Sequence, residues 1–219
     1  MSDVALVVFD LDGTLIDSSV DLANAVNVLL SELGAQPLPV AAVVSMVGDG
    51  ARMLVRRALK ASGLDQDLPD ALDRFLAYYN AHLLDHTVPY AGMSETLESI
   101  DGRVRKAVLT NKPTRATELI LDRLQLRAGF QHVIGGDTPF GRKPDPAGLL
   151  HLTLAADAHP SKVLLVGDSA VDLATARNAG TRICLARYGF GYRFAPQDFR
   201  GDELFIDSPT DLIGILEGG

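Results

Sequence analysis

Short apolar runs that lack the alternation of a half-exposed strand recur along the chain, and they constrain its fold more than any other feature. Stretches with helical periodicity separate them, such as the one after Thr114 and the one that ends at Gly180. Strands that are apolar on both sides are covered on both faces, as in the parallel sheets of α/β proteins. The pattern predicts a doubly wound, Rossmann-like parallel sheet with right-handed crossovers. The runs expected to form strands are residues 4–9, 106–109, 132–134, 163–166, 182–186 and 204–206.

One long interval near the N-terminus breaks the alternation of strands and helices. Between residues 18 and 85 the pattern shows four helical segments and no strand. The first follows Ser18 and stops at Gly34, and the others begin at Pro39, after Gly50 and near Pro69. We therefore predict a small α-helical cap domain of residues 18–85, inserted into an α/β core formed by residues 1–17 and 86–219.

Composition narrows the classes of partner. The chain has 219 residues and a net charge of −8, and its Lys and Arg residues form no basic block, which argues against nucleic-acid binding. The single Cys184 lies in an apolar segment and is expected in the core. The N-terminal stretch has no basic patch and only six apolar residues before Asp10, so it is not expected to be a signal peptide or a membrane span. We expect a cytoplasmic monomer or homodimer that binds small or metal-complexed ligands, with no nucleic-acid or membrane partner.

Polar side chains follow several of the predicted strands at the point where each strand ends. In an open parallel sheet, ligands bind beyond the carboxyl ends of the strands, near the point where strand order reverses. Taken alone, each aspartate there is as easily a turn former or a helix cap. Several carboxylates on one edge repel by up to about 4 kcal/mol per close pair at an effective dielectric constant of roughly 20, and so require a compensating cation. The polar residues expected at this edge are Asp10, Asp12, Thr110, Asn111, Lys112, Lys143, Asp168 and Asp172.

Magnesium is the cation that the aspartates at this edge favour, because their ligand atoms are oxygens and Mg²⁺ binds through carboxylates, water and substrate phosphate. Zinc lacks support, since the five His residues do not cluster; His82 and His86 are expected at a helix end that faces solvent. The glycine pair Gly189 and Gly191 lacks the third glycine of a dinucleotide fingerprint. The sequence therefore predicts Mg²⁺ as the cofactor.

Four motifs resemble those of the haloacid dehalogenase superfamily in their order and setting. They are FDLDGTL at residues 9–15, Thr110 at a strand end, Lys143 within GRKPDP, and GDSAVD at residues 167–172. The resemblance extends over essentially the whole chain and includes a helical cap inserted after the first motif. Any one motif is weak, whereas four on matching strand ends are specific.

The resemblance implies a set of roles for these residues. It implies phosphomonoester hydrolysis through an aspartyl-phosphate, with Asp10 as the nucleophile and Asp12 as the general acid and base. It further implies that Thr110 and Lys143 bind the phosphoryl group and that Asp172 supports Lys143 or a metal-bound water. The Mg²⁺ ligands expected are Asp10, Asp12 and Asp168.

The chemistry of the residues agrees with these roles. Asp10 ends a buried strand and is therefore rigidly placed, and the residue two positions along points to the same side, so that Asp12 can reach the leaving oxygen. A carboxylate nucleophile divides hydrolysis into two easier steps. Gly13 allows a tight turn that frees backbone amides near the phosphoryl oxygens. We expect Gly13 and Asn111 to contact substrate.

The substrate depends on the cap. The stretches MVGDGARMLVRRAL, VPYAGMSETL and VLTNKPT are similar to those of bacterial phosphoglycolate phosphatases. That similarity implies hydrolysis of 2-phosphoglycolate, a small phosphate ester with a carboxylate. A cationic cap residue would match this carboxylate, and Arg52 or Arg56 is the candidate, although a solvated helix face explains both arginines equally well.

Three alternatives remain open at this point. A hexose-phosphate phosphatase or phosphomutase of the same superfamily would keep the core motifs and differ in its cap. A dehalogenase would not need Asp12. A receiver-like module that carries a phosphoryl group without turnover would use a similar aspartate, threonine and lysine, but it would not need a helical insert over the site.

Overall fold

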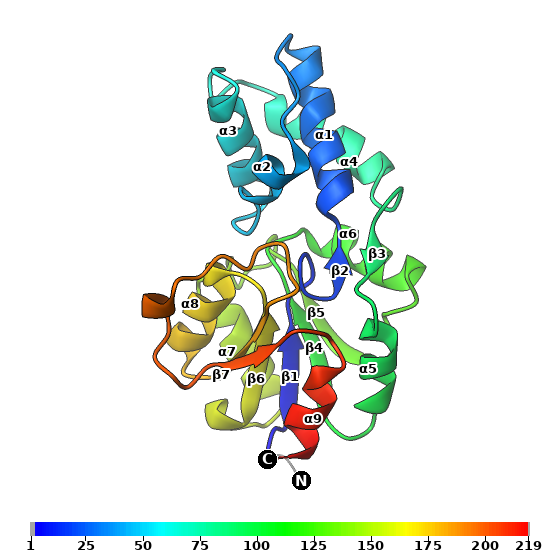
Figure 1. Cartoon of the computed structure of the whole chain (residues 1–219). Coiled ribbons are helices and arrows are strands. Elements are labelled where there is room, and N and C mark those ends of the chain that lie inside the picture. The colour runs from blue at the N-terminus through cyan, green and yellow to red at the C-terminus, as the bar shows by residue number, and fades with distance from the viewer. Residues whose placement is uncertain (1–2, 219) are drawn as a thin grey trace.

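A six-stranded, entirely parallel sheet forms the centre of the computed structural model, which describes residues 3–218 (Figure 1). The strand order is β5-β4-β1-β6-β7-β8. This confirms the predicted α/β fold and its six strands, although β1 begins two residues later than predicted and β5 begins two residues earlier. The strands are β1 (Leu6–Phe9), β4 (Arg105–Leu109), β5 (Phe130–Ile134), β6 (Val163–Gly167), β7 (Arg182–Ala186) and β8 (Leu204–Ile206).

The four inner strands of the sheet are buried on both faces, which explains their apolar runs, whereas the edge strand β5 exposes Gln131 and His132. In β1, Val7 and Phe9 pack into the hydrophobic cluster on one face, and Leu6 and Val8 pack into the cluster on the other. Helices α5 (Met93–Ser99), α6 (Thr114–Arg123) and α9 (Asp211–Glu217) cover the first face, and α7 (Ala147–Ala155) and α8 (Ala170–Ala179) cover the second (Figure 1).

A helical cap stands over the carboxyl ends of the strands (Figure 1). It consists of α1 (Ser19–Glu32), α2 (Val40–Val44), α3 (Ala51–Ala61) and α4 (Ala71–Ala81). The chain enters and leaves it through two short strands that pair antiparallel, β2 (Ile16–Asp17) and β3 (Val88–Pro89). The inserted helical cap is as predicted. Its limits at residues 18 and 85 remain a prediction, and the β2–β3 ribbon lies beside both of them.

A buried carboxylate fixes the base of the cap. Asp21 in the first turn of α1 accepts hydrogen bonds from the backbone amides of His86 and Thr87 and from the Thr87 hydroxyl. Asp21 is only 2% exposed, so these bonds satisfy a charge that would otherwise be costly to bury. The two chain segments that join cap and core are therefore tied to each other.

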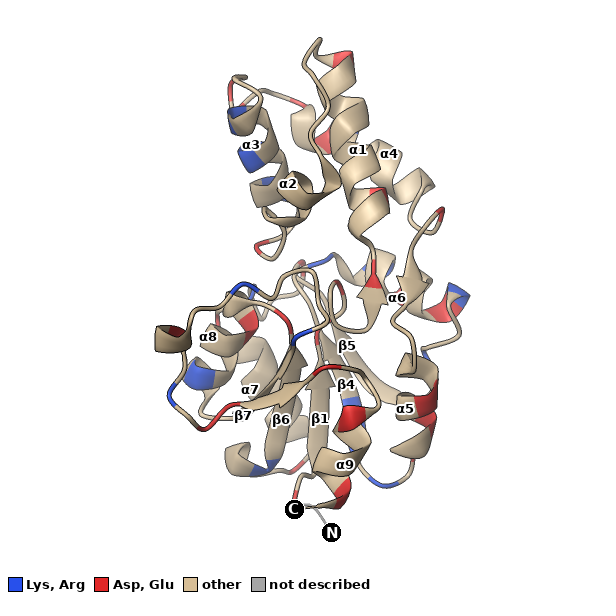
Figure 2. Cartoon of the chain, viewed as in Figure 1, with Lys and Arg blue, Asp and Glu red and all other residues tan. Residues whose placement is uncertain are grey.

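The single cysteine and the histidine pair lie away from the polar edge of the sheet. Cys184 is fully buried in the core, and His82 pairs with Asp85 at 2.7 Å rather than with His86. Figure 2 shows Lys and Arg interspersed with Asp and Glu over the visible ribbon. Within residues 3–218, every helix is too short or too polar to traverse a lipid bilayer.

Glu203 is expected to stabilise the fold in a pH-dependent way. Burial disfavours its charged form, but hydrogen bonds from the Arg200 and Gly201 amides and from Arg177 outweigh this and lower its pKa from 4.5 to about 2. Because the pKa is lower in the folded chain, the stabilisation is present above pH 4.5 and is lost as the pH falls towards 2. Glu203→Gln should lower the free energy of unfolding by about 1–3 kcal/mol at pH 7.

Urea denaturation of the wild type and the Glu203→Gln variant at pH 7 and at pH 3 tests this. The difference in unfolding free energy should shrink at the lower pH. An equal difference at both pH values would show that the carboxylate charge does not contribute.

Candidate active site

The polar residues expected at one edge of the sheet do meet there. Strand order reverses at β1, which lies between β4 and β6, and ligand sites of open parallel sheets form at such a point. Asp10 follows β1, Thr110 follows β4 and Asp168 follows β6, and all three are buried. The parallel registers of these strands therefore place the three side chains beside one another.

Lys143 lies between two carboxylates of this site. Its Nζ is 2.8 Å from Oδ1 of Asp10 and 2.6 Å from Oδ1 of Asp172, and its side chain is 2% exposed. Asp172 also accepts hydrogen bonds from the backbone amide and the hydroxyl of Ser169, which fixes it at the start of α8. Burial opposes the charge of Lys143, but Asp10 and Asp172 outweigh it and raise the pKa of the ammonium above its usual value. Lys143 is therefore a rigidly held cation beside Asp10.

Asp10, Asp168 and Asp172 form a buried cluster of carboxylates. One oxygen from each can be chosen so that all three lie within 4.8 Å of one another. The pKa of Asp10 is raised from 3.8 to about 7, because burial and the neighbouring Asp172 raise it by more than Lys143 lowers it. Burial, Asp172 and Asp10 raise the pKa of Asp168 well above its usual value. One lysine does not balance three carboxylates, so the donor set and its charge suit a divalent cation that binds oxygen.

Glycines bring the backbone close to Asp168. Gly13 has a φ of 86°, and a Cβ atom there or at Gly189 would collide with the Asp168 carboxylate. The backbone amide of Gly191 donates a hydrogen bond of 2.7 Å to Oδ2 of Asp168. The pair Gly189 and Gly191 thus belongs to this site, although its spacing in the sequence gives no sign of that position.

The Asp12 carboxylate is paired with Lys112 rather than with the carboxylate cluster. Nζ of Lys112 lies 2.6 Å from Oδ1 and 2.7 Å from Oδ2 of Asp12, and the Ser18 hydroxyl donates to Oδ1 at 2.6 Å. Asp12 is 14% exposed at the side chain and Lys112 only 4%. Of the three metal ligands predicted from sequence, the structure brings Asp10 and Asp168 into one cluster and directs Asp12 elsewhere.

Thr110 and Asn111, which follow β4, form hydrogen bonds with the next residue of their own loop, with the cap and with the loop of Lys143. The Thr110 hydroxyl accepts a hydrogen bond from the amide of Lys112 at 3.2 Å. The Asn111 side-chain amide donates to the carbonyls of Gly48, in the cap, and of Lys143, in the core. Asn111 Oδ1 is buried and has no hydrogen-bond partner among residues 3–218. Asn111 therefore links the cap to the loop that carries Lys143 and leaves one acceptor free.

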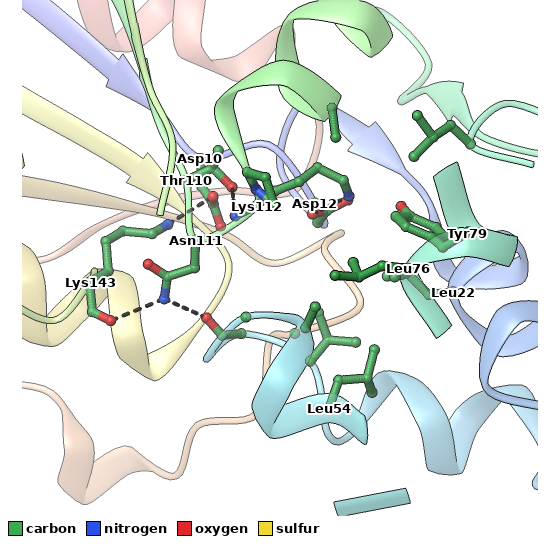
Figure 3. Close-up of a pocket in the computed structure, with 18 of the residues that line it drawn as sticks. Asp10, Asp12, Leu22, Leu54, Leu76, Tyr79, Thr110, Asn111, Lys112 and Lys143 are labelled. Atoms are coloured by element: carbon green, nitrogen blue, oxygen red, sulfur yellow. Dashed lines mark hydrogen bonds and ion pairs between the residues drawn. The ribbon is translucent and has the colours of Figure 1, made fainter. Parts of the chain in front are cut away.

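A cavity of about 570 Å³ lies between cap and core, directly over these residues. Figure 3 shows its two unlike sides: charged and polar groups of the core face apolar side chains of the cap. Such a site can hold a small anionic ligand against the polar side and exclude water with the apolar side. The cap side chains that line it include Leu22, Leu54, Phe75, Leu76, Tyr79 and Leu83.

Arg52 and Arg56, the two predicted cap cations, do not line this cavity. Arg52 is exposed on α3, and Arg56 forms an ion pair with Asp67 at 3.1 Å. The basic residues that do line the cavity are Lys112, Lys143 and Arg115, all from the core.

Two residues of the site have no function assigned from the sequence. Lys112 is expected at this edge because it follows Thr110 and Asn111 past a strand end, but the sequence does not indicate its partner. Tyr79 lies in the cap helix α4, and only the folded arrangement brings it near Lys112.

Comparison with known proteins identifies the family of the chain. Residues 7–186 match the family of haloacid dehalogenase-like hydrolases, and the chain belongs to that family. It is 43% identical to a phosphoglycolate phosphatase of Pseudomonas putida, over 97% of this chain and 79% of the relative. It is 36% identical to a phosphoglycolate phosphatase of Chromobacterium violaceum, over 100% and 99% of the two chains.

Solved structures agree with this placement. A crystal structure of a predicted phosphoglycolate phosphatase from Haemophilus somnus superimposes with a TM-score of 0.89 at 31% identity, covering 98% of this chain and 99% of that one. CbbY of Rhodobacter sphaeroides, solved with phosphate, has the same fold with a TM-score of 0.78 at 21% identity, over 98% and 99% of the chains. With its homologues, the chain is an enzyme of the phosphatase type.

Proposed function

We propose that the chain is a Mg²⁺-dependent phosphomonoesterase that forms a phospho-Asp10 intermediate and hydrolyses 2-phosphoglycolate to glycolate and phosphate. The observation that carries the proposal is the buried Asp10 carboxylate, held 2.8 Å from Lys143 within a cluster of carboxylates at the cavity between cap and core. Its action in the cytoplasm, as a monomer or homodimer, is part of the same proposal.

The reaction proceeds in two displacements at phosphorus. An oxygen of Asp10 attacks phosphorus, the ester bond breaks, and Asp12 gives its proton to the departing alkoxide. Water then attacks the phospho-Asp10, Asp12 takes a proton from that water, and phosphate leaves with Asp10 restored. Lys143 and the Thr110 hydroxyl bind the phosphoryl oxygens on which negative charge accumulates. The backbone turn at Gly13 and the side chain of Asn111 complete the substrate contacts.

Magnesium fits the carboxylate cluster by charge and by the chemistry of its donors. Asp10 and Asp168 are the two predicted ligands that lie in the cluster, and Asp172, held by Ser169 and Lys143, is adjacent to both. When bound, Mg²⁺ supplies positive charge that offsets the carboxylates and the substrate phosphate.

Removal of divalent metal should stop turnover. We expect a chelator to lower the rate of phosphate release by about 100-fold or more, because the carboxylates then repel the substrate phosphate, and added Mg²⁺ to restore it. Mg²⁺ should also raise the melting temperature of the wild type, since it binds only the folded chain, and should raise that of Asp168→Asn less. A rate that chelation leaves unchanged would remove the metal from the mechanism.

The substrate assignment rests on relatives that bear the name phosphoglycolate phosphatase over nearly the whole chain. A second candidate is a hexose-phosphate phosphatase or phosphomutase, which the cavity volume of about 570 Å³ favours. A receiver-like phosphoryl carrier is less well supported, because the cap encloses the site.

Phosphate release from a substrate panel tests the substrate assignment. The panel holds 2-phosphoglycolate, hexose and triose phosphates, a nucleoside monophosphate and pyrophosphate, each with and without Mg²⁺. We expect the highest kcat/KM with 2-phosphoglycolate. A profile led by a hexose phosphate would favour a hexose-phosphate phosphatase, and a flat profile would contradict the assignment of 2-phosphoglycolate. No release from any member would contradict phosphatase activity and favour a phosphomutase or a phosphoryl carrier.

A further inference from the structure

Lys112 brings a buried ammonium to the wall of the cavity, beside Asp12 and Tyr79. A lysine ammonium has three N–H groups, and two of them bind the oxygens of Asp12. The side chain is 4% exposed and lines the cavity. Burial lowers the pKa of the ammonium, but Asp12 and Tyr79 outweigh this and raise it above its usual value, so the group stays charged. Asp12 therefore takes two of the three N–H groups, and a ligand in the cavity would share the third with Tyr79.

The hydroxyl of Tyr79 offers a second donor at the same place. Tyr79 is 4% exposed, and its Oη is buried without a hydrogen-bond partner in the described part of the chain. Nζ of Lys112 lies 5.0 Å from the centre of its ring. Figure 3 shows the side chain reaching from α4 towards Lys112 and Asp12, next to Leu22 and Leu76. A buried hydroxyl without a partner is costly, so a ligand that accepts its hydrogen bond gains free energy.

The position of these donors relative to the reacting atoms indicates which ligand group they bind. During turnover the ester oxygen lies at Asp12, which protonates it. In a phosphorylated 2-hydroxy acid of two carbons, the carboxylate carbon is two bonds beyond that oxygen. Lys112 is in contact with Asp12, and the cap side chains that line the cavity are apolar except for Tyr79 and Asn80.

From these observations we propose that Lys112 and Tyr79 bind the carboxylate of the leaving group and so determine the preference for phosphoglycolate. This inference rests on the proposed function. It places the specificity cation on the core loop after β4 instead of on Arg52 or Arg56 of the cap. A carboxylate accepts hydrogen bonds from both donors, whereas an alcohol in its place leaves the ammonium without a matching charge.

The test compares 2-phosphoglycolate with 2-hydroxyethyl phosphate, which has an alcohol in place of the carboxylate. The quantity measured is the ratio of kcat/KM for the two substrates. Lys112→Met should reduce the ratio by about 10- to 100-fold, because a fold-change of this size corresponds to the free energy that a hydrogen bond to a charged group contributes. Tyr79→Phe, which keeps the ring, should reduce it by about 3- to 10-fold. Lys60→Met and Tyr78→Phe are matched controls outside the cavity and should leave the ratio unchanged.

Each outcome has a separate meaning. If Lys112→Met lowers kcat/KM equally for both substrates, Lys112 only holds Asp12 in place and the proposal is wrong. Tyr79→Phe keeps the test decisive if the lysine variant does not fold. A wild type that prefers phosphoglycolate, with both variants retaining the full ratio, would overturn the carboxylate site alone. A wild type without any preference would overturn the proposed substrate as well.

Discussion

Replacement of Asp10 by Asn is expected to lower kcat for phosphomonoester hydrolysis by about 10⁴-fold or more, because an amide cannot form the acyl phosphate. The geometry around the residue should survive, since Asn has nearly the same shape and can still accept a hydrogen bond from Lys143. Removal of one charge from the cluster of Asp10, Asp168 and Asp172 lessens its repulsion. The melting temperature at pH 7 without added metal should therefore be equal to or above that of the wild type.

Steady-state phosphate release and thermal unfolding of the same preparation check this prediction. Asp122→Asn, the same substitution on the exposed face of α6, is the matched control and should leave both quantities unchanged. If Asp10→Asn kept normal activity, the assignment of Asp10 as the nucleophile would be refuted. If it unfolded, the loss of activity would carry no information on mechanism.

Replacement of Lys143 by Ala is expected to remove activity and to destabilise the fold. The ammonium is the shared partner of Asp10 and Asp172, and its loss leaves buried carboxylates without a fixed cation. Loss of one partner of a buried ion pair lowers the free energy of unfolding by about 3–5 kcal/mol. The rate should fall by about 10³-fold or more, because the phosphoryl oxygens lose a preorganised positive charge.

A double variant separates the two effects. Lys143→Ala combined with Asp172→Asn removes one of the uncompensated charges, so the free energy of unfolding should recover in part while turnover stays absent. Denaturant titration and phosphate release on the single and double variants provide the comparison. Wild-type stability in Lys143→Ala, or recovered activity in the double variant, would contradict the role given to this lysine.

The fold could be predicted because its signals are local. Predicted strand runs such as residues 4–9 and 163–166 are apolar throughout, and this pattern of two-sided burial is typical of covered parallel sheets. The helices of the cap carry capping residues and apolar faces that a single sequence shows. The β2–β3 ribbon escaped notice because strands of two residues, such as Val88–Pro89, have no period.

The site could be predicted in part for a similar reason. Asp10, Thr110 and Asp168 follow strand ends, and the topology rule places strand ends of one parallel sheet together. The partner of Asp12 could not be predicted, since Lys112 lies 100 positions away along the chain. Cap residues of the site were the hardest to predict. Nothing in the sequence around Tyr79 or the arginines of α3 distinguishes a residue that lines a cavity from one on a solvated helix face.

Acid quench of the enzyme during turnover of 2-phosphoglycolate, followed by peptide mass spectrometry, tests the central claim most directly. We expect one added phosphoryl group on the peptide that contains Asp10. It should be present only with substrate and Mg²⁺, and it should be absent from the Asp10→Asn variant. Active enzyme with no such adduct in a rapid-quench time course, or with the phosphoryl group on another residue, would contradict it.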